Sequence, residues 1–323
     1  MESKAAGVTP TPNPPEKRVK KLTIKGETYS WSEIGIGWLL LLPALAFLVF
    51  TFVIPVIQVI QLSFTNYNTI TGAMSPAGFS NYVYLLTGET SAYFYQSLGH
   101  TVVYAVVRIG FDITLALLIA VMLDSYIPMK KFLRASYFAP VVVPVVASSL
   151  IWLWFYDPGV GPFNQILGWL NIPASKWLYH ESTSLMSVLI FSIWKGLGYN
   201  MILFLTGLQG IPDSYIEAAR IDGATNWQLF WRIKLPLLRP IMSFVLMMDF
   251  IEAFKAFTEV NVMTPDGGPL RSTMLIVNYI YELAFSNGRM GRAAACAMIL
   301  FLIILAFTII RNRMNASKTV DYD

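Results

Sequence analysis

Four ionisable side chains interrupt one apolar stretch of the sequence, residues 241–263. They are Asp249, Glu252, Lys255 and Glu259, and at about 100° per residue they share a helical face about 120° wide. Charged groups are costly against lipid, so this face is expected to contact protein or water. Lys255 could simply neutralise Glu252 and Glu259 at spacings of three and four residues. Asp249 has no cation four residues later and is the stronger candidate for facing a watery path.

Two further stretches carry groups that could bind a ligand or pair with one another. In residues 185–208, spacings of four and three place Ser192, Gly196 and Tyr199 on one side of a helix. Hydroxyl groups on that side could hydrogen-bond to a polar ligand, and the aromatic ring could contact its apolar face.

Residues 98–123 contain a pair of opposite charges, Arg108 and Asp112. Side chains four residues apart are neighbours on a helix surface. We expect these two to form a structural ion pair.

The elements that hold these residues are long apolar runs. The chain is 55% hydrophobic and 13% charged, which is unusual for a soluble domain. Each run is about long enough to cross a bilayer as a helix, and none shows the alternation of a strand. The sequence therefore predicts an all-α integral membrane protein with six transmembrane helices. The runs cover residues 37–62, 98–123, 135–155, 185–208, 241–263 and 293–310.

The basic residues predict the orientation in the membrane. Of the 23 Lys and Arg, 16 fall in the two terminal segments and the loops 124–134 and 209–240, four fall in the other loops, and three lie inside the apolar runs. Short cytoplasmic loops retain positive charge. Both termini are therefore expected to be cytoplasmic, and a net charge of +4 without a basic face predicts no nucleic-acid partner.

Several kinds of site are not expected. One cysteine and two histidines are too few for an internal disulfide or a Cys/His metal cluster. No G-x-x-x-x-G-K-[ST] phosphate loop occurs, so any ATP chemistry must come from another chain.

The loop of residues 211–240 carries a distinctive pattern. Ser214 with Glu217, and Thr225 with Gln228, read as two capping boxes, with Gly223 between them where a left-handed or close-packed backbone is needed. We expect a helix-turn-helix outside the bilayer that needs a partner to cover its apolar groups. Those groups are Tyr215, Ile216, Ala219, Trp227 and Phe230.

The spacing E-A-A-x3-G-x9-I-x-L-P, from Glu217 to Pro236, resembles the EAA loop of bacterial binding-protein-dependent import permeases. The resemblance implies a fold like that of type I ABC importer permeases, in which this loop forms coupling helices that dock into a cleft of the ATPase subunit. The residues implied in ATPase coupling are Glu217, Ala218, Ala219, Asp222, Gly223, Ala224 and Phe230.

The resemblance extends from about residue 38 to residue 310 and is closest to carbohydrate permeases of the maltose, glycerol-phosphate and multiple-sugar type. Residues that carry it include Pro55, Asn81-Tyr82, Pro140, Pro144 and Gly267-Gly268-Pro269, whereas His100 departs from the family's usual Asn. Alignment with the maltose permease subunit places sugar contacts at Ser192, Gly196, Tyr199, Asp249, Glu252, Ala253 and Ala256. Two carboxylates would oppose an anionic substrate unless a sister subunit supplied cations, so the charge of the sugar stays open.

The resemblance implies a permease subunit that moves a mono- or oligosaccharide across the cytoplasmic membrane by alternating access. It also implies that the chain is not itself an enzyme and binds no cofactor, with ATP and Mg expected on the ATPase. The implied partners are a second homologous permease, an ABC ATPase dimer, an extracytoplasmic sugar-binding protein and membrane lipid.

The domain boundaries expected are a disordered basic cytoplasmic tail at 1–34, a permease domain at 35–314 with its coupling loop at 211–236, and a C-terminal tail at 315–323. Two other functions stay open at this point. An ion- or proton-coupled secondary transporter could use Asp249, Glu252 or Arg108 as a relay. An intramembrane enzyme could use Asp249 and Glu252 as an acid pair.

Overall fold

The computed structural model describes residues 21–24, 27–67, 69, 71–125 and 128–316, and the chain divides into two units after Gln58. In the first unit, β1 (Lys21–Ile24) pairs antiparallel with β2 (Glu27–Ser30). Helix α1 (Trp31–Leu48) follows directly. The segment predicted as a tail, residues 1–34, thus includes this hairpin, whose β-branched and aromatic residues favour strands, and the start of α1. Residues 1–20, 25 and 26 lie outside the described residues, and the tail stays a prediction.

The first apolar run forms one long helical rod. Helix α1 continues through a π-helical turn, η1 (Val49–Val53), into α2 (Ile54–Ser63). Pro55 follows this turn and has no N–H to donate, which is a common reason for a local change in helical pitch. Residues Gly35–Ser63 together are long and apolar enough to cross a membrane.

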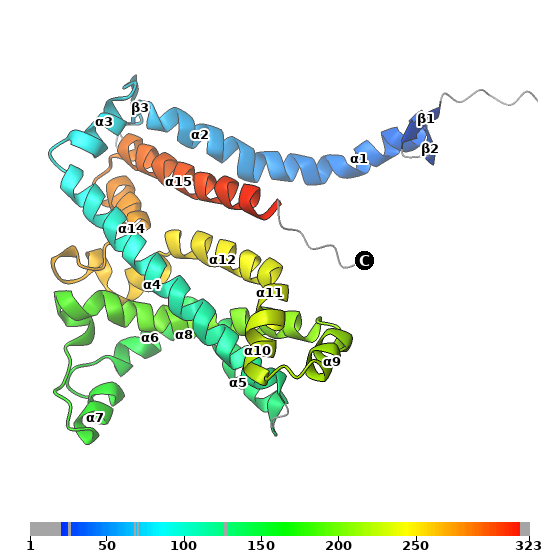
Figure 1. Cartoon of the computed structure of the whole chain (residues 1–323). Coiled ribbons are helices and arrows are strands. Elements are labelled where there is room, and N and C mark those ends of the chain that lie inside the picture. Colours follow the sequence, from blue (N-terminus) through cyan, green and yellow to red (C-terminus); the bar gives the residue numbers. More distant parts are fainter. Residues whose placement is uncertain (1–20, 25–26, 68, 70, 126–127, 317–323) are drawn as a thin grey trace, which may run out of the picture. The chain divides into compact units, whose positions relative to one another are not determined.

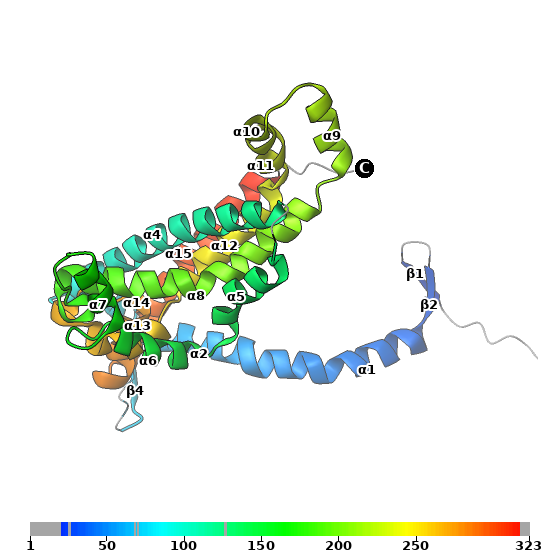
Figure 2. The same ribbon diagram turned by 90° about the horizontal axis from the view of Figure 1, so that it is seen from below.

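The second unit is built around two long parallel helices, α4 (Ser91–Asp124) and α8 (Glu181–Gln209), which pack along each other (Figures 1 and 2). Helix α12 (Arg239–Phe254) lies against α4, and α15 (Met290–Ala316) against α12. Apolar side chains fill two clusters, one around Phe191 and one around Phe204. The arrangement is helical with two short hairpins among the described residues, which confirms the predicted all-α class.

The third apolar run is bent. Helix α5 (Lys130–Val142) and α6 (Val145–Phe155) meet at an angle of 100°. Pro144 stands at the break, and a residue before proline is disfavoured in helical conformation. The run predicted as a single span at 135–155 is thus a bent pair.

The fifth run is also interrupted. Helix α12 has 16 residues and ends at Phe254, and a new helix, α13 (Thr258–Met263), begins after an irregular segment. In the described part of the chain, four helices are long and apolar enough to span a membrane, or five if the bent pair counts as one span. Six spans remain a prediction.

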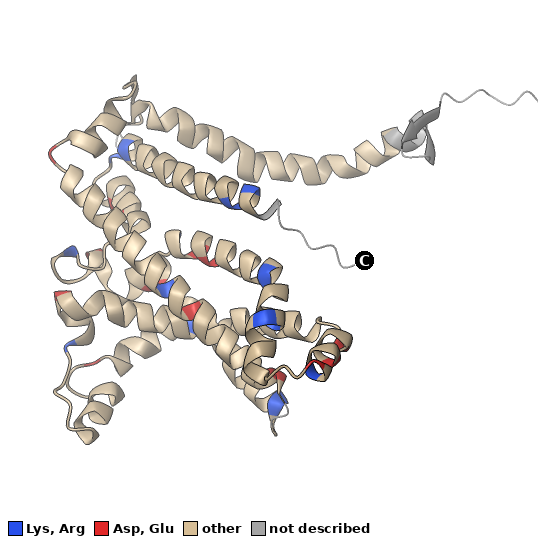
Figure 3. Cartoon of the chain, in the orientation of Figure 1, with Lys and Arg blue, Asp and Glu red and all other residues tan. Residues whose placement is uncertain are grey.

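The connecting segments hold short elements. These are β3 (Thr65–Tyr67), β4 (Met74–Pro76), α3 (Ser80–Thr87), α7 (Pro162–Trp169), η2 (Trp177–Tyr179), α9 (Asp213–Ile221), α10 (Asn226–Leu229), η3 (Phe230–Lys234), α11 (Leu235–Leu237), η4 (Pro265–Gly267), η5 (Pro269–Arg271), α14 (Ile276–Tyr281) and η6 (Glu282–Ser286). Charged residues lie mid-helix in α4 and at the two ends of α15 (Figure 3).

Candidate functional site

The loop between α8 and α12 begins with helix α9. Its N-cap is Pro212, with no side-chain hydrogen bond to the first turn. The capping box predicted for Ser214 and Glu217 is therefore wrong. Ser214 lies inside the first turn because the helix already starts at Asp213, so its hydroxyl is not at the N-cap position.

The second helix of the loop, α10, is capped as predicted. The Thr225 side chain accepts a hydrogen bond from the Gln228 N–H at 3.3 Å, and the Gln228 side chain accepts one from the Thr225 N–H at 2.9 Å. These reciprocal bonds satisfy two backbone donors that would otherwise lack partners. They fix where the second helix begins.

Gly223 makes the turn between the two helices. Its φ is +79°, its N–H donates to the Arg220 carbonyl at 3.0 Å, and the Ala224 N–H donates to the Ala219 carbonyl at 2.9 Å. This pair of bonds is a Schellman motif, which needs a left-handed residue. A β-carbon on Gly223 would meet no atom within 4 Å, so the backbone conformation, and not close packing, requires glycine.

The residues predicted to couple to an ATPase are not all on the surface. Glu217, Ala218, Asp222 and Gly223 are exposed, Ala224 and Phe230 are half-buried, and Ala219 is buried. The expectation that Ala219 is presented outward is therefore wrong, because its side chain lies on the inner side of α9.

The apolar surface of the loop is larger than the sequence pattern indicated. Ile221 is 86% exposed and Trp227 70% exposed, and Trp231 is also exposed. The Trp227 and Trp231 rings lie 5.3 Å apart, as their spacing of four residues allows. Ile221 and Trp231 were missed, although that spacing could have signalled Trp231.

A cavity of about 300 Å³ lies between α4, α8, α12 and α13. Four of the seven predicted substrate residues line it: Ser192, Gly196, Glu252 and Ala256. Two separate helical faces therefore do meet at one cavity.

The other three predicted residues do not line this cavity. Asp249 is buried, and both of its oxygens accept hydrogen bonds from Asn200 Nδ2, at 2.9 and 3.0 Å. Ala253 is fully buried, whereas Tyr199 is exposed elsewhere. The charged face at 249–259 is split because the helix breaks after Phe254.

Tyr104 is a fully buried residue that was not predicted from the sequence, and it bonds to two side chains that line the cavity. Its hydroxyl is hydrogen-bonded to Ser192 Oγ at 2.7 Å and to Glu259 Oε1 at 3.0 Å. It thereby joins α4, α8 and α13. A tyrosine within an apolar run is normally interpreted as a core residue, so the local sequence did not indicate this hydrogen-bonding role.

The predicted ion pair between Arg108 and Asp112 is not formed. Arg108 lines the cavity, whereas Asp112 is fully buried. Arg108 Nε and both Asp112 oxygens are buried without hydrogen-bond partners among the described residues. Asp112 lies behind Gly196, where an added β-carbon would be 2.8 Å from Asp112 Oδ2, so this glycine leaves room for the carboxylate.

Lysines in the cavity wall have different roles. Lys195 Nζ donates to the carbonyls of Pro140, Val141 and Val143 at the bend between α5 and α6. These carbonyls lose helical partners at the break, so Lys195 satisfies them. Lys255 lines the same cavity and makes no such bonds to the part of the chain that the structure describes. The alternative in which Lys255 pairs with Glu252 and Glu259 is not seen, since the ion pairs within the described residues are Lys234–Asp124 and Arg271–Glu282.

The chain is similar in sequence to known transporter permeases. The chain is 32% identical to the probable ABC transporter permease protein YurN of Bacillus subtilis (strain 168), over 86% of this chain and 95% of that protein. It is 33% identical to the multiple sugar-binding transport system permease protein MsmF of Streptococcus mutans, over 86% and 94%.

A solved structure shares the fold. It is a chain of a bacterial ABC transporter involved in the import of the acidic polysaccharide alginate, with a TM-score of 0.78, 23% identity, and coverage of 90% of this chain and 99% of that chain. Residues 112–319 match the family described as binding-protein-dependent transport system inner membrane component. With its long apolar helices, the chain is therefore a multi-pass membrane protein that belongs to the binding-protein-dependent transport system inner membrane component family.

Proposed function

We propose that this chain is the permease subunit of an ATP-driven importer that carries a carbohydrate across the cytoplasmic membrane by alternating access. The observation that carries the proposal is the loop around Gly223, where a Schellman turn sets two short helices with exposed Ile221 and Trp227 outside the long helices. Such a surface needs a partner. The loop contains the EAA pattern, and in this family the EAA loop is expected to dock onto an ATPase subunit.

The substrate class is inferred from relatives and from the cavity. MsmF is named for transport of multiple sugars. The cavity combines Ser192, Glu252 and Arg108 with the ring of Phe191, and hydroxyl, carboxylate, guanidinium and aromatic groups together suit a polyhydroxylated ring. We assign substrate contact to the four predicted residues that line it, with Tyr199, Asp249 and Ala253 as supporting positions.

ATP hydrolysis is assigned to a separate chain, because this sequence lacks a phosphate-binding loop. The proposed assembly contains a second homologous permease, an ATPase dimer with ATP and Mg, and an extracytoplasmic sugar-binding protein. The distribution of Lys and Arg supports cytoplasmic termini. The permease domain is proposed to run from residue 35 to residue 314, with its coupling loop at 211–236.

Reconstituted uptake tests the proposal. Proteoliposomes that contain the two permeases and the ATPase should import a labelled sugar only with ATP inside and the binding protein outside. Glu217→Lys should abolish uptake without reducing membrane insertion. Uptake that survives ATP depletion and collapses with a protonophore would instead establish a secondary transporter.

A further inference from the structure

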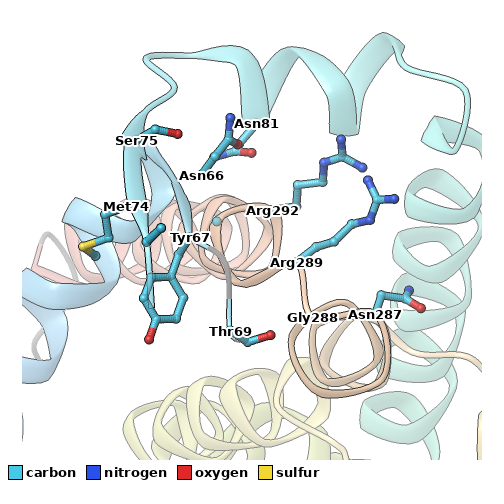
Figure 4. Close-up of a pocket in the computed structure, with 12 residues that line it drawn as sticks. Asn66, Tyr67, Thr69, Met74, Ser75, Asn81, Asn287, Gly288, Arg289 and Arg292 are labelled. Carbon is cyan, nitrogen blue, oxygen red and sulfur yellow. The ribbon is translucent and has the colours of Figure 1, made fainter. Parts of the chain in front are cut away.

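Two adjoining cavities open where α15 begins. They have volumes of about 470 and 460 Å³, and both are lined by Asn287, Arg289 and Arg292. The first cavity also borders the hairpin of β3 and β4, and the second borders α3 and α14. Figure 4 shows the side chains of Arg289, which precedes α15, and Arg292, in its first turn, extending in the same direction.

These cavities carry unbalanced positive charge. Glu282 is the one acidic residue that lines either of them, and it is already held by Arg271 in two hydrogen bonds of 2.7 and 3.0 Å. The bond to Glu282 raises the pKa of Arg271 above its ordinary value. Within the described residues, Arg289 and Arg292 have no carboxylate within 4.0 Å, so two cations three residues apart stand without a counter-charge.

The surrounding structure holds this charge in place. Arg292 lies over the Tyr84 ring, with its guanidinium carbon 3.4 Å from the ring centroid, and the Arg289 N–H donates to the Leu283 carbonyl at 2.7 Å. The pKa of the Tyr84 hydroxyl is lowered, mainly by a hydrogen bond with Thr90 and further by the charges of Arg292 and Arg289, against the effect of burial. An anion is therefore favoured beside these groups.

The site lies on the side of the membrane opposite the coupling loop. Arg292 contacts α3, which leads into the N-terminal end of α4. The coupling loop is bonded to the other end of α4 through Lys234 and Asp124. A helix of 34 residues is about 50 Å long, which exceeds the thickness of a bilayer.

Exposed apolar side chains surround the charged cavities. Met74 borders the first cavity and is 57% exposed. Tyr93, which borders the second, is also exposed, and Phe285, from the π-helical segment that precedes α15, is 67% exposed. Arginine, tyrosine, phenylalanine and methionine are the residues enriched at protein interfaces, so this surface suits a protein better than a small free anion.

We propose that Arg289 and Arg292 form a docking site for carboxylate side chains of the extracytoplasmic binding protein. The inference rests on the proposed function, because it assumes that the coupling loop faces the cytoplasm. Both guanidinium groups can bind carboxylates in a bidentate manner. The charge pair steers the loaded binding protein to the end of the helical bundle where α15 begins.

Binding measurements on the intact complex test this proposal. The permease–ATPase complex is placed in phosphatidylcholine nanodiscs, and its affinity for the cognate binding protein is measured at low and high NaCl. Arg289→Gln combined with Arg292→Gln should weaken binding at low salt by about tenfold or more and flatten its salt dependence. Lys176→Gln, which changes a cation outside both cavities, should leave affinity unchanged. Equal affinity and salt dependence in the double variant and the parent would overturn the proposal.

Two further arms identify other occupants. If the double variant loses affinity only in nanodiscs that contain phosphatidylglycerol, the arginines bind lipid headgroups and the proposal is wrong. If the parent complex without binding protein binds glucuronate and the double variant does not, the cavities form a sugar site and the proposal is again wrong. Failure of the proposed function would appear differently, as absence of ATP-dependent uptake by the parent.

Discussion

Lys234 Nζ lies 2.7 Å from Asp124 Oδ2, which ties the coupling loop to the C-terminal end of α4. The two positions are 110 residues apart in the sequence. Helix α4 also contributes Arg108 to the cavity, and its Tyr104 bonds to the cavity residues Ser192 and Glu259. This ion pair is therefore a direct connection between the proposed ATPase-docking surface and the helix that forms one wall of the cavity.

Breaking this connection should uncouple hydrolysis from uptake. Asp124→Asn should lower sugar uptake per ATP hydrolysed several-fold, while stability changes by about 1 kcal/mol or less because the pair is partly exposed. ATPase activity and uptake are measured on the same proteoliposomes. The exchanged pair Asp124→Lys with Lys234→Asp should recover part of the coupling, and Arg239→Gln should serve as a neutral control. Unchanged stoichiometry in Asp124→Asn would refute the link.

Substitution of Gly223 should depend on how well the new residue adopts positive φ. Gly223→Val should cost about 1–2 kcal/mol locally and weaken capture of the ATPase, whereas Gly223→Asn should be milder because Asn tolerates the left-handed region. Co-purification of the ATPase with each variant is the measurement. Equal losses in the two variants would argue for a steric role, which the empty space around this residue does not support.

Gly196→Ala should impair transport by pushing against the buried carboxylate of Asp112. An added β-carbon would lie 2.8 Å from its Oδ2, so the complex should lose both thermal stability and uptake. Gly110→Ala is the matched control on α4, since nothing lies within 4 Å of its β-carbon position. That variant should be neutral or more stable by up to about 1 kcal/mol, because alanine favours helix. Similar melting temperatures for the two variants would contradict the steric argument.

Substitutions of Lys195 and Lys255 should have different effects on stability and on transport. Lys195→Met removes the donor to three carbonyls at the bend between α5 and α6 and should destabilise the complex by about 1–3 kcal/mol. Lys255→Met changes the same cavity but breaks no such bond, so it should alter uptake with little effect on stability. Thermal unfolding and uptake are compared for both. A stable Lys195→Met variant would show that another group supports the bend.

The sequence predicted the long elements better than their interruptions. Apolar runs located α4, α8 and α15 because length and composition decide such helices. The run at 135–155 was predicted as a single span, although it bends by 100° at Pro144. Lys195, which bonds to carbonyls at this bend, lies more than 50 residues away in the sequence. The end of α12 near Lys255 carried no proline or glycine signal.

The candidate site shows the same division between local and distant information. Thr225 and Gly223 were predicted because capping and left-handed turns depend on neighbouring residues. Helical spacing correctly predicted that Ser192 and Gly196 share a face, and both line the cavity. It could not distinguish Glu252, which also lines the cavity, from Asp249, which accepts hydrogen bonds from Asn200. Pairings of that kind are decided by which helices pack together.

The hydrogen bonds of the Tyr104 hydroxyl can form only late in the synthesis of the chain. Its partners Ser192 and Glu259 follow 88 and 155 residues later in the chain. Helix α4 is synthesised well before either partner. The Tyr104 hydroxyl therefore lacks its Glu259 acceptor until α13 has been translated. Truncated chains that end before residue 259 therefore lack one acceptor of this hydrogen-bond network.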